Sequence, residues 1–197
     1  GHPFAGFMAF ALPLALILHH VLLAADEKRG KPFFQTIRHV GGCWLLLASL
    51  VLEASWQAER HAHPPHFWAF IAVTAVLAAS IALVAWGAKR GLWPFAVGAA
   101  RYVPLGVSPA LAGLAVLLPL GNATLSGADG LGWPYLPLLN VFDATQVAVT
   151  ASLLLLAGRL KPEQGRLLRG AIFALAFIWL SALAGRIAHH WGGVPFA

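Results

Sequence analysis

The fold of this chain is most constrained by long apolar runs that alternate with short polar segments. The clearest run, residues 67–87, has 21 residues and no charged side chain, which is enough for an α-helix to cross a bilayer. The chain is 59% hydrophobic and 10% charged, whereas soluble domains carry about 25% charged residues. We therefore predict an all-α fold, a polytopic transmembrane helical bundle. Residues 1–197 are expected to form one domain with six membrane spans, at about 4–25, 38–57, 67–87, 103–120, 138–157 and 170–190.

The fourth of these spans departs from a regular helical pattern. Pro104, Pro109 and Pro119 all fall inside or at the end of residues 103–120. Proline has no backbone N–H and clashes with the preceding helical turn, so it bends or breaks a helix. We expect this span to be broken or partly re-entrant.

Basic residues are distributed unevenly between the two sides of the expected spans. Eleven of the thirteen lysines and arginines fall in or beside alternate loops. They are Lys28, Arg29, Lys31 and Arg38, then Lys89, Arg90 and Arg101, and then Arg159, Lys161, Arg166 and Arg169. Cytoplasmic loops carry such an excess, so these loops are predicted to face the cytoplasm and both chain ends to face outward. The net charge of +6 is thus an orientation signal, and we predict no nucleic-acid partner.

Polar side chains near the outward ends of three spans suggest a common layer. At about 1.5 Å per residue, Glu53, Asp143 and Arg186 each lie within roughly 6–8 Å of the outer end of their span. Helical periodicity puts neighbouring polar residues on the faces that carry these charges. The candidate ligand-binding or ion-pair residues are Glu53, Asn140, Asp143, Gln146, Arg186, His189 and His190.

Two interpretations of this layer remain open from the sequence. In one, Arg186 pairs with Asp143 or Glu53 and locks the helices together. In the other, the layer is a ligand or proton site, because charged residues inside membrane spans commonly mark function. Two carboxylates facing one arginine favour the second interpretation, since the unmatched carboxylate would need a proton, a charged histidine or a bound cation.

The cysteine and histidine residues follow no metal- or cofactor-binding motif. The single cysteine, Cys43, excludes a cysteine cluster. The expected outward-side histidines follow no compact metal-binding spacing; they are His61, His63, His66, His189 and His190. The other histidines that we expect on helices are not placed opposite one another on different spans, as the two axial ligands of a haem would be. We therefore predict no metal site and no cofactor.

Three separated segments resemble one protein family. They are Pro134–Asn140 with the following Asp143 and Gln146, Arg186–Pro195, and Glu53–Gln57. All three are similar to segments of the bacterial predicted membrane protein family with domain of unknown function 2339. Members of that family are longer chains with many membrane helices, and the resemblance implies no reaction. It implies that this chain is a piece from the C-terminal half of such a protein, as its first residue, a glycine, also suggests.

These expectations lead to a prediction of function. The protein is expected in the bacterial inner (cytoplasmic) membrane as a multi-pass protein with both ends of this piece on the periplasmic side. Its partners would be the lipid bilayer and the remaining helices of a longer parent chain or partner membrane subunits. We predict that it binds or transports a small polar or envelope-related ligand at an outward-facing polar pocket. The alternatives are a membrane-embedded envelope-biogenesis enzyme for glycosyl or acyl transfer, with Asp143 or Glu53 as general base, and a structural scaffold subunit.

Overall fold

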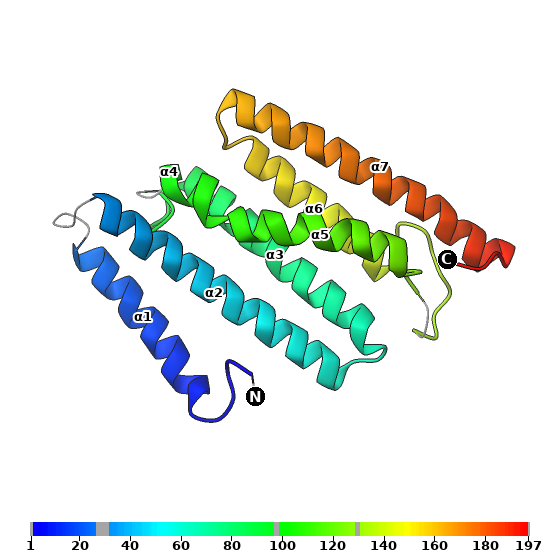
Figure 1. Ribbon diagram of the computed structural model, residues 1–197, viewed down its shortest axis with the longest axis horizontal. Coiled ribbons are helices and arrows are strands. Elements are labelled where there is room, and N and C mark those ends of the chain that lie inside the picture. The colour runs from blue at the N-terminus through cyan, green and yellow to red at the C-terminus, as the bar shows by residue number, and fades with distance from the viewer. Residues whose placement is uncertain (1, 27–31, 97–98, 129–130, 197) are drawn as a thin grey trace.

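The computed structural model describes residues 2–26, 32–96, 99–128 and 131–196, and over these ranges it contains helices and no strand (Figure 1). This confirms the predicted all-α fold. The elements are α1 (Met8–Asp26), α2 (Pro32–His61), α3 (Pro65–Arg90), α4 (Ala99–Arg101), the π-helical segment η1 (Tyr102–Gly106), α5 (Ser108–Thr124), α6 (Val141–Ala157) and α7 (Pro162–Gly192).

The long helices form a row, and a further helix lies across it. Along the row α1 packs on α2, α2 on α3, α3 on α6 and α6 on α7 (Figure 1). Helix α5 crosses the face of α3 and also reaches α7, while η1 packs on α2. The most deeply buried apolar side chains come from α3, α5 and α6 and include Ile81, Ala110 and Leu156, each 0% exposed. The core therefore lies in the middle of the row.

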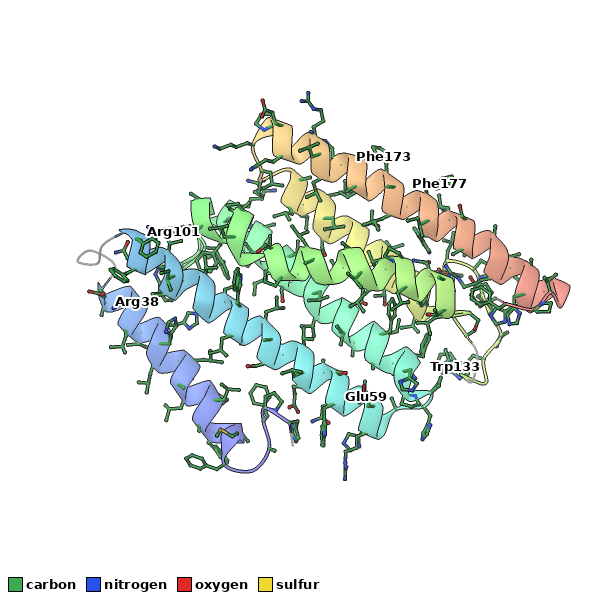
Figure 2. The ribbon with its side chains drawn as sticks, in the orientation of Figure 1. Arg38, Glu59, Arg101, Trp133, Phe173 and Phe177 are labelled. Carbon is green, nitrogen blue, oxygen red and sulfur yellow. The ribbon has the colours of Figure 1, made fainter. Side chains whose placement is uncertain are left out.

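The two edges of the row carry large apolar side chains that no other described element covers. On α7, Phe173 and Phe177 are 76% and 73% exposed and point away from the bundle (Figure 2). Within the described ranges, five helical stretches are long and apolar enough to cross a membrane: α1, α2, α3, residues 99–124 and α7. Helix α6 is apolar but has only 17 residues. The protein is thus integral to a membrane, and its apolar helices contact the lipid bilayer.

The helices run alternately up and down, so their ends gather at two ends of the bundle. We call one the histidine end, because His61, His63, His66, His189 and His190 lie there at the ends of α2, α3 and α7. We call the other the basic end; Arg38 and Arg101 lie there, whereas Glu59 and Trp133 lie at the histidine end (Figure 2). Lys28, Arg29 and Lys31 fall outside the described residues. Which end faces the cytoplasm stays a prediction.

The expected break in the fourth span lies at η1. The N–H of Val107 donates to Tyr102 O at 3.2 Å, five residues back, which is the π-helical pattern. In a regular helix Leu105 O would accept from the N–H of residue 109, but residue 109 is a proline and has none. The hydroxyl of Ser108 and the indole Nε1 of Trp44 donate to Leu105 O instead, at 2.8 Å and 3.0 Å. Trp44 of α2 and the adjacent Ser108 thus replace the hydrogen bond that Pro109 cannot make, and the chain stays helical on both sides of η1.

Candidate functional site

Helix α6 begins at Val141, three residues later than the sequence predicts. Asn140 is its N-cap, with extended backbone, and its side-chain Oδ1 accepts a hydrogen bond from the N–H of Asp143 at 2.9 Å. Just before it, Leu138 has a φ of +66°, a left-handed conformation that is uncommon for leucine. A turn therefore occupies the expected first helical residues, and Asp143 lies in the first turn of α6.

The carboxylate of Asp143 is fully buried and receives hydrogen bonds on both oxygens. Oδ2 accepts from Asn140 Nδ2 at 2.6 Å, from the backbone N–H of Leu138 at 3.1 Å and from the Tyr135 hydroxyl at 3.2 Å. Burial raises the pKa of the Tyr135 phenol above its ordinary value, so the phenol keeps its proton and acts as a donor. One carboxylate oxygen thus holds the turn that precedes α6.

The second oxygen of Asp143 joins α6 to α7. Oδ1 accepts from Trp179 Nε1 at 2.8 Å and from Arg186 Nη2 at 3.3 Å. The Arg186 side chain is 0% exposed, as is that of Asp143, so the ion pair is fully shielded from solvent. A buried pair of this kind is strongly destabilised when only one partner is removed, because the other charge is then left uncompensated.

Arg186 also contacts α5 and the start of α6. Its Nη1 and Nη2 both donate to Asn122 Oδ1 at 3.3 Å. Its guanidinium carbon lies 4.6 Å from the centre of the Phe142 ring, a cation–π geometry. One arginine therefore ties three helices together. We call Asn122, Tyr135, Asn140, Asp143, Trp179 and Arg186 the buried polar cluster.

The connection between α5 and α6 comprises residues 125–140, and its described parts, residues 125–128 and 131–140, are held against the end of α7. His190 Nε2 lies 3.1 Å from Ser126 O, and its ring stacks on Tyr135 with centroids 4.5 Å apart. Trp191 Nε1 donates to Tyr135 O at 3.2 Å. Gly127 has a φ of +91°, and a Cβ there would lie 3.1 Å from Arg186 Cδ. The backbone conformation therefore favours glycine at this position, and a side chain there would also crowd Arg186.

Gln146 and His189 lie near the cluster without joining the ion pair. Gln146 is buried one turn further along α6, and its Nε2 has no hydrogen-bond partner among the described residues. His189 Nδ1 lies 2.7 Å from Val194 O and helps to close the end of α7. Gln146 therefore borders the cluster, whereas the ring of His189 packs against His190 and Phe196 at the end of α7.

The structure does not bring Glu53 to this cluster. The Glu53 carboxylate is hydrogen-bonded to His2 Nδ1, and it accepts from Gln57 Nε2 at 2.6 Å and from the N–H of Phe4 at 3.3 Å. The His2 ring also stacks on Trp56 with centroids 3.7 Å apart. Glu53 therefore fastens the N-terminal segment to α2. The expected excess of two carboxylates over one arginine does not occur around Arg186.

A cavity of about 390 Å³ lies beside the cluster at the histidine end. We call it the loop pocket, because the 125–140 connection forms most of its wall. That wall includes Trp133, Leu136, Leu139 and the N-cap Asn140, and the opposite side includes His63 and Trp68. The pocket is thus mainly apolar and aromatic, with Asn140 shared between its wall and the buried polar cluster. Among the described residues, no group of three or more histidine, cysteine, aspartate or glutamate side chains could hold a metal ion.

Three members of the cluster were missed by sequence reasoning. Trp179 lies seven residues before Arg186 on α7, so the two share a helix face, and this spacing was a usable signal. Asn122 lies in a short match to a glycosylation site and gave no separate signal. Tyr135 lies in an irregular segment, where no periodicity indicates the direction of a side chain. A further signal was the pair Asn140 and Asp143, since a capping residue followed three positions later by an acid marks a helix start.

Comparison with known proteins agrees with the helical, membrane-embedded character of the chain. No curated protein and no solved structure matches it. One family model, described as "Predicted membrane protein (DUF2339)", matches residues 1–196. The match includes every residue of the buried polar cluster and of the loop pocket. The chain therefore belongs to this family of predicted membrane proteins.

Proposed function

We propose that the protein binds the apolar part of an amphipathic, envelope-type ligand in the loop pocket. The observation that carries this proposal is the cavity of about 390 Å³ walled by the 125–140 connection. Small-molecule sites usually enclose about 300–1,000 Å³ and combine apolar walls with a few polar groups. The loop pocket has this composition, with Asn140 and His63 as polar groups among Trp68, Trp133 and leucines.

The buried polar cluster supports this role by holding the pocket wall in place. Tyr135 and Leu138 donate to Asp143, and the end of α7 binds Ser126 and Tyr135. Connections longer than about 12–15 residues without secondary structure are uncommon in compact domains and usually functional. A long connection that is fixed at several points to a buried ion pair fits a preorganised binding wall.

The same contacts favour an apolar ligand over a small polar one. Asp143 and Arg186 are 0% exposed and bind protein groups, so a polar ligand in the loop pocket would not meet their charges. This arrangement also disfavours the enzyme alternative, because Asp143 would have to break its hydrogen bonds before it could take a substrate proton.

A scaffold role remains the second candidate, and a specific observation favours it. Asp143 accepts from five protein donors, and Arg186 joins α5, α6 and α7. A carboxylate whose two oxygens are both occupied by protein donors is typical of a structural lock. The two roles make different predictions, because a pure scaffold needs no ligand in the loop pocket.

Photolabelling with an alkyl-diazirine dodecanol tests the binding proposal. The full-length protein is irradiated with this probe in detergent, and adducts are mapped by peptide mass spectrometry. We expect adducts to be enriched on residues 131–141 and to fall several-fold in Trp133→Ala. Trp133 is 79% exposed, so its loss should leave the fold intact.

Trp86→Ala is the matched control, because Trp86 is also an exposed tryptophan, near the basic end of α3. It should leave labelling of residues 131–141 unchanged. Adducts spread evenly over the exposed faces of α1 and α7, with no enrichment in the loop pocket, would refute the binding proposal and leave the scaffold role.

A further inference from the structure

A second cavity lies at the basic end, away from the loop pocket. Its volume is about 480 Å³, and it lies between the α4–η1 region and the turn that joins α6 to α7. Ala99, Ala100, Val103 and Pro104 contribute an apolar floor, and Arg159 and Lys161 belong to its rim. We call it the basic pocket. It does not depend on the proposed function of the loop pocket.

The rim of the basic pocket has a strong positive charge. Arg159 and Lys161 are two residues apart, and both are exposed. Arg101, on the neighbouring α4, donates to Gln35 Oε1 at 3.4 Å and so keeps its charge at the same end. Glu163, in the first turn of α7, is exposed and does not line the pocket. The described lining therefore combines cationic side chains with apolar surface.

The position of the pocket along the helices indicates which parts of a membrane lipid it would contact. Helix α3 ends at Arg90, α6 ends at Ala157 and α7 begins at Pro162, so the rim lies where the helices leave the membrane. Val103 and Pro104 lie further along the chain, toward the membrane interior. An anionic phospholipid has a matching profile, with a phosphate at the surface and acyl chains below it. Basic pockets between membrane helices bind such headgroups.

We propose that the basic pocket binds an anionic phospholipid, with its phosphate between Arg159 and Lys161 and its glycerol and first acyl carbons on the apolar floor. Charge complementarity selects an anionic headgroup over a zwitterionic one. The apolar floor selects a lipid over a soluble phosphate. The site is thus a specific lipid site at one end of the bundle, distinct from the general lipid contact along α1 and α7.

Native mass spectrometry of the full-length protein tests this proposal. The purified protein is titrated separately with phosphatidylglycerol and phosphatidylcholine, and bound lipids are counted. We expect one phosphatidylglycerol to bind more tightly than the rest, and phosphatidylcholine to show no such step. Arg159→Gln with Lys161→Gln should weaken that step about 25-fold, since each basic residue near an anionic headgroup contributes about fivefold.

Two controls distinguish lipid binding in the basic pocket from nonspecific attraction to the positive charge of the basic end. Lys89→Gln with Arg166→Gln removes two exposed basic residues from the same end that do not line the pocket, and it should leave the tight step unchanged. Ala100→Phe keeps every charge but fills the floor, and it should also abolish the step. Equal loss in both glutamine pairs would overturn the proposal. Displacement of the lipid by inorganic phosphate at equal concentration would assign the pocket to a soluble phosphate instead.

Discussion

Asp143 is the residue on which the arrangement of the histidine end depends. Its two oxygens accept from the turn before α6, from Trp179 and from Arg186. All of these groups donate hydrogen bonds, so the side chain at position 143 must be an acceptor, and the charge of Arg186 requires that it be negative. For this reason, exchanging the two charges between positions 143 and 186 should not restore the cluster. An arginine at position 143 would face the N–H of Leu138 and the amide of Asn140.

Asp143→Asn should lower the free energy of unfolding by about 3–5 kcal/mol, because it leaves the charge of Arg186 buried and uncompensated. Titration of the protein in mixed micelles with sodium dodecyl sulfate measures the change. Glu163→Gln, which removes an exposed carboxylate, serves as control and should stay within about 0.5 kcal/mol of wild type. An Asp143→Asn protein as stable as that control would show that the ion pair is not a lock.

The sequence identified the centre of this cluster but not its surroundings. Asn140, Asp143 and Arg186 stand out because polar residues on apolar helices are costly and must find partners. The depth of Glu53 along its span was estimated, but depth does not determine which neighbouring element a side chain meets. Its partner, His2, lies in a segment before α1. Tyr135 and Asn122 required the tertiary arrangement to be known.

At the scale of elements, the α6–α7 hairpin depends on one close backbone contact. A Cβ on Gly165 would lie 2.7 Å from the carbonyl oxygen of Ala157. Only glycine allows the first turns of α7 to approach the end of α6 so closely. The short turn between the two helices, which carries Arg159 and Lys161, is positioned by this contact.

Gly165→Ala should destabilise the protein by about 1–3 kcal/mol through overpacking. Thermal unfolding followed by circular dichroism in detergent measures the effect. Gly170→Ala is the matched control on the same helix, because a Cβ there meets nothing within 4 Å. It should raise stability by up to about 1 kcal/mol through helix propensity. If both variants behave alike, the close contact at Gly165 is not required.

Helix interiors were more predictable than helix boundaries. The prolines of the fourth span indicated a break, but not that Trp44 would bind the carbonyl freed by Pro109. Helices α2, α3 and α7 extend further than the apolar runs, because polar and basic turns continue them beyond the membrane core. The start of α6 was placed too early because its capping turn is rich in leucine.

At the scale of the whole molecule, the bundle is a row with two ends of different chemistry. Most of the described arginines and lysines lie toward the basic end, where Figure 2 labels Arg38 and Arg101, whereas His61, His63, His66, His189 and His190 lie at the other end. The sequence predicted this separation from the alternation of basic loops. The same alternation predicts that the basic end faces the cytoplasm.

Cysteine labelling tests that orientation. In a Cys43→Ser background, Trp133→Cys should react with a membrane-impermeant maleimide added to intact cells, because Trp133 is exposed at the histidine end. Gln164→Cys, exposed at the basic end, should react only after the cells are opened. The reverse pattern would invert the predicted topology.

The shortness of α6 has a consequence for how a ligand reaches the loop pocket. Seventeen residues span about 26 Å, less than the roughly 30 Å of a bilayer's hydrocarbon core. The membrane must thin locally, or the connection before α6 must fill the missing depth. Leu136, Leu138 and Leu139 are 49%, 51% and 82% exposed there, so they can contact acyl chains. An amphipathic ligand would then enter sideways from the leaflet by two-dimensional diffusion, and its mole fraction in the membrane would set the occupancy of the pocket.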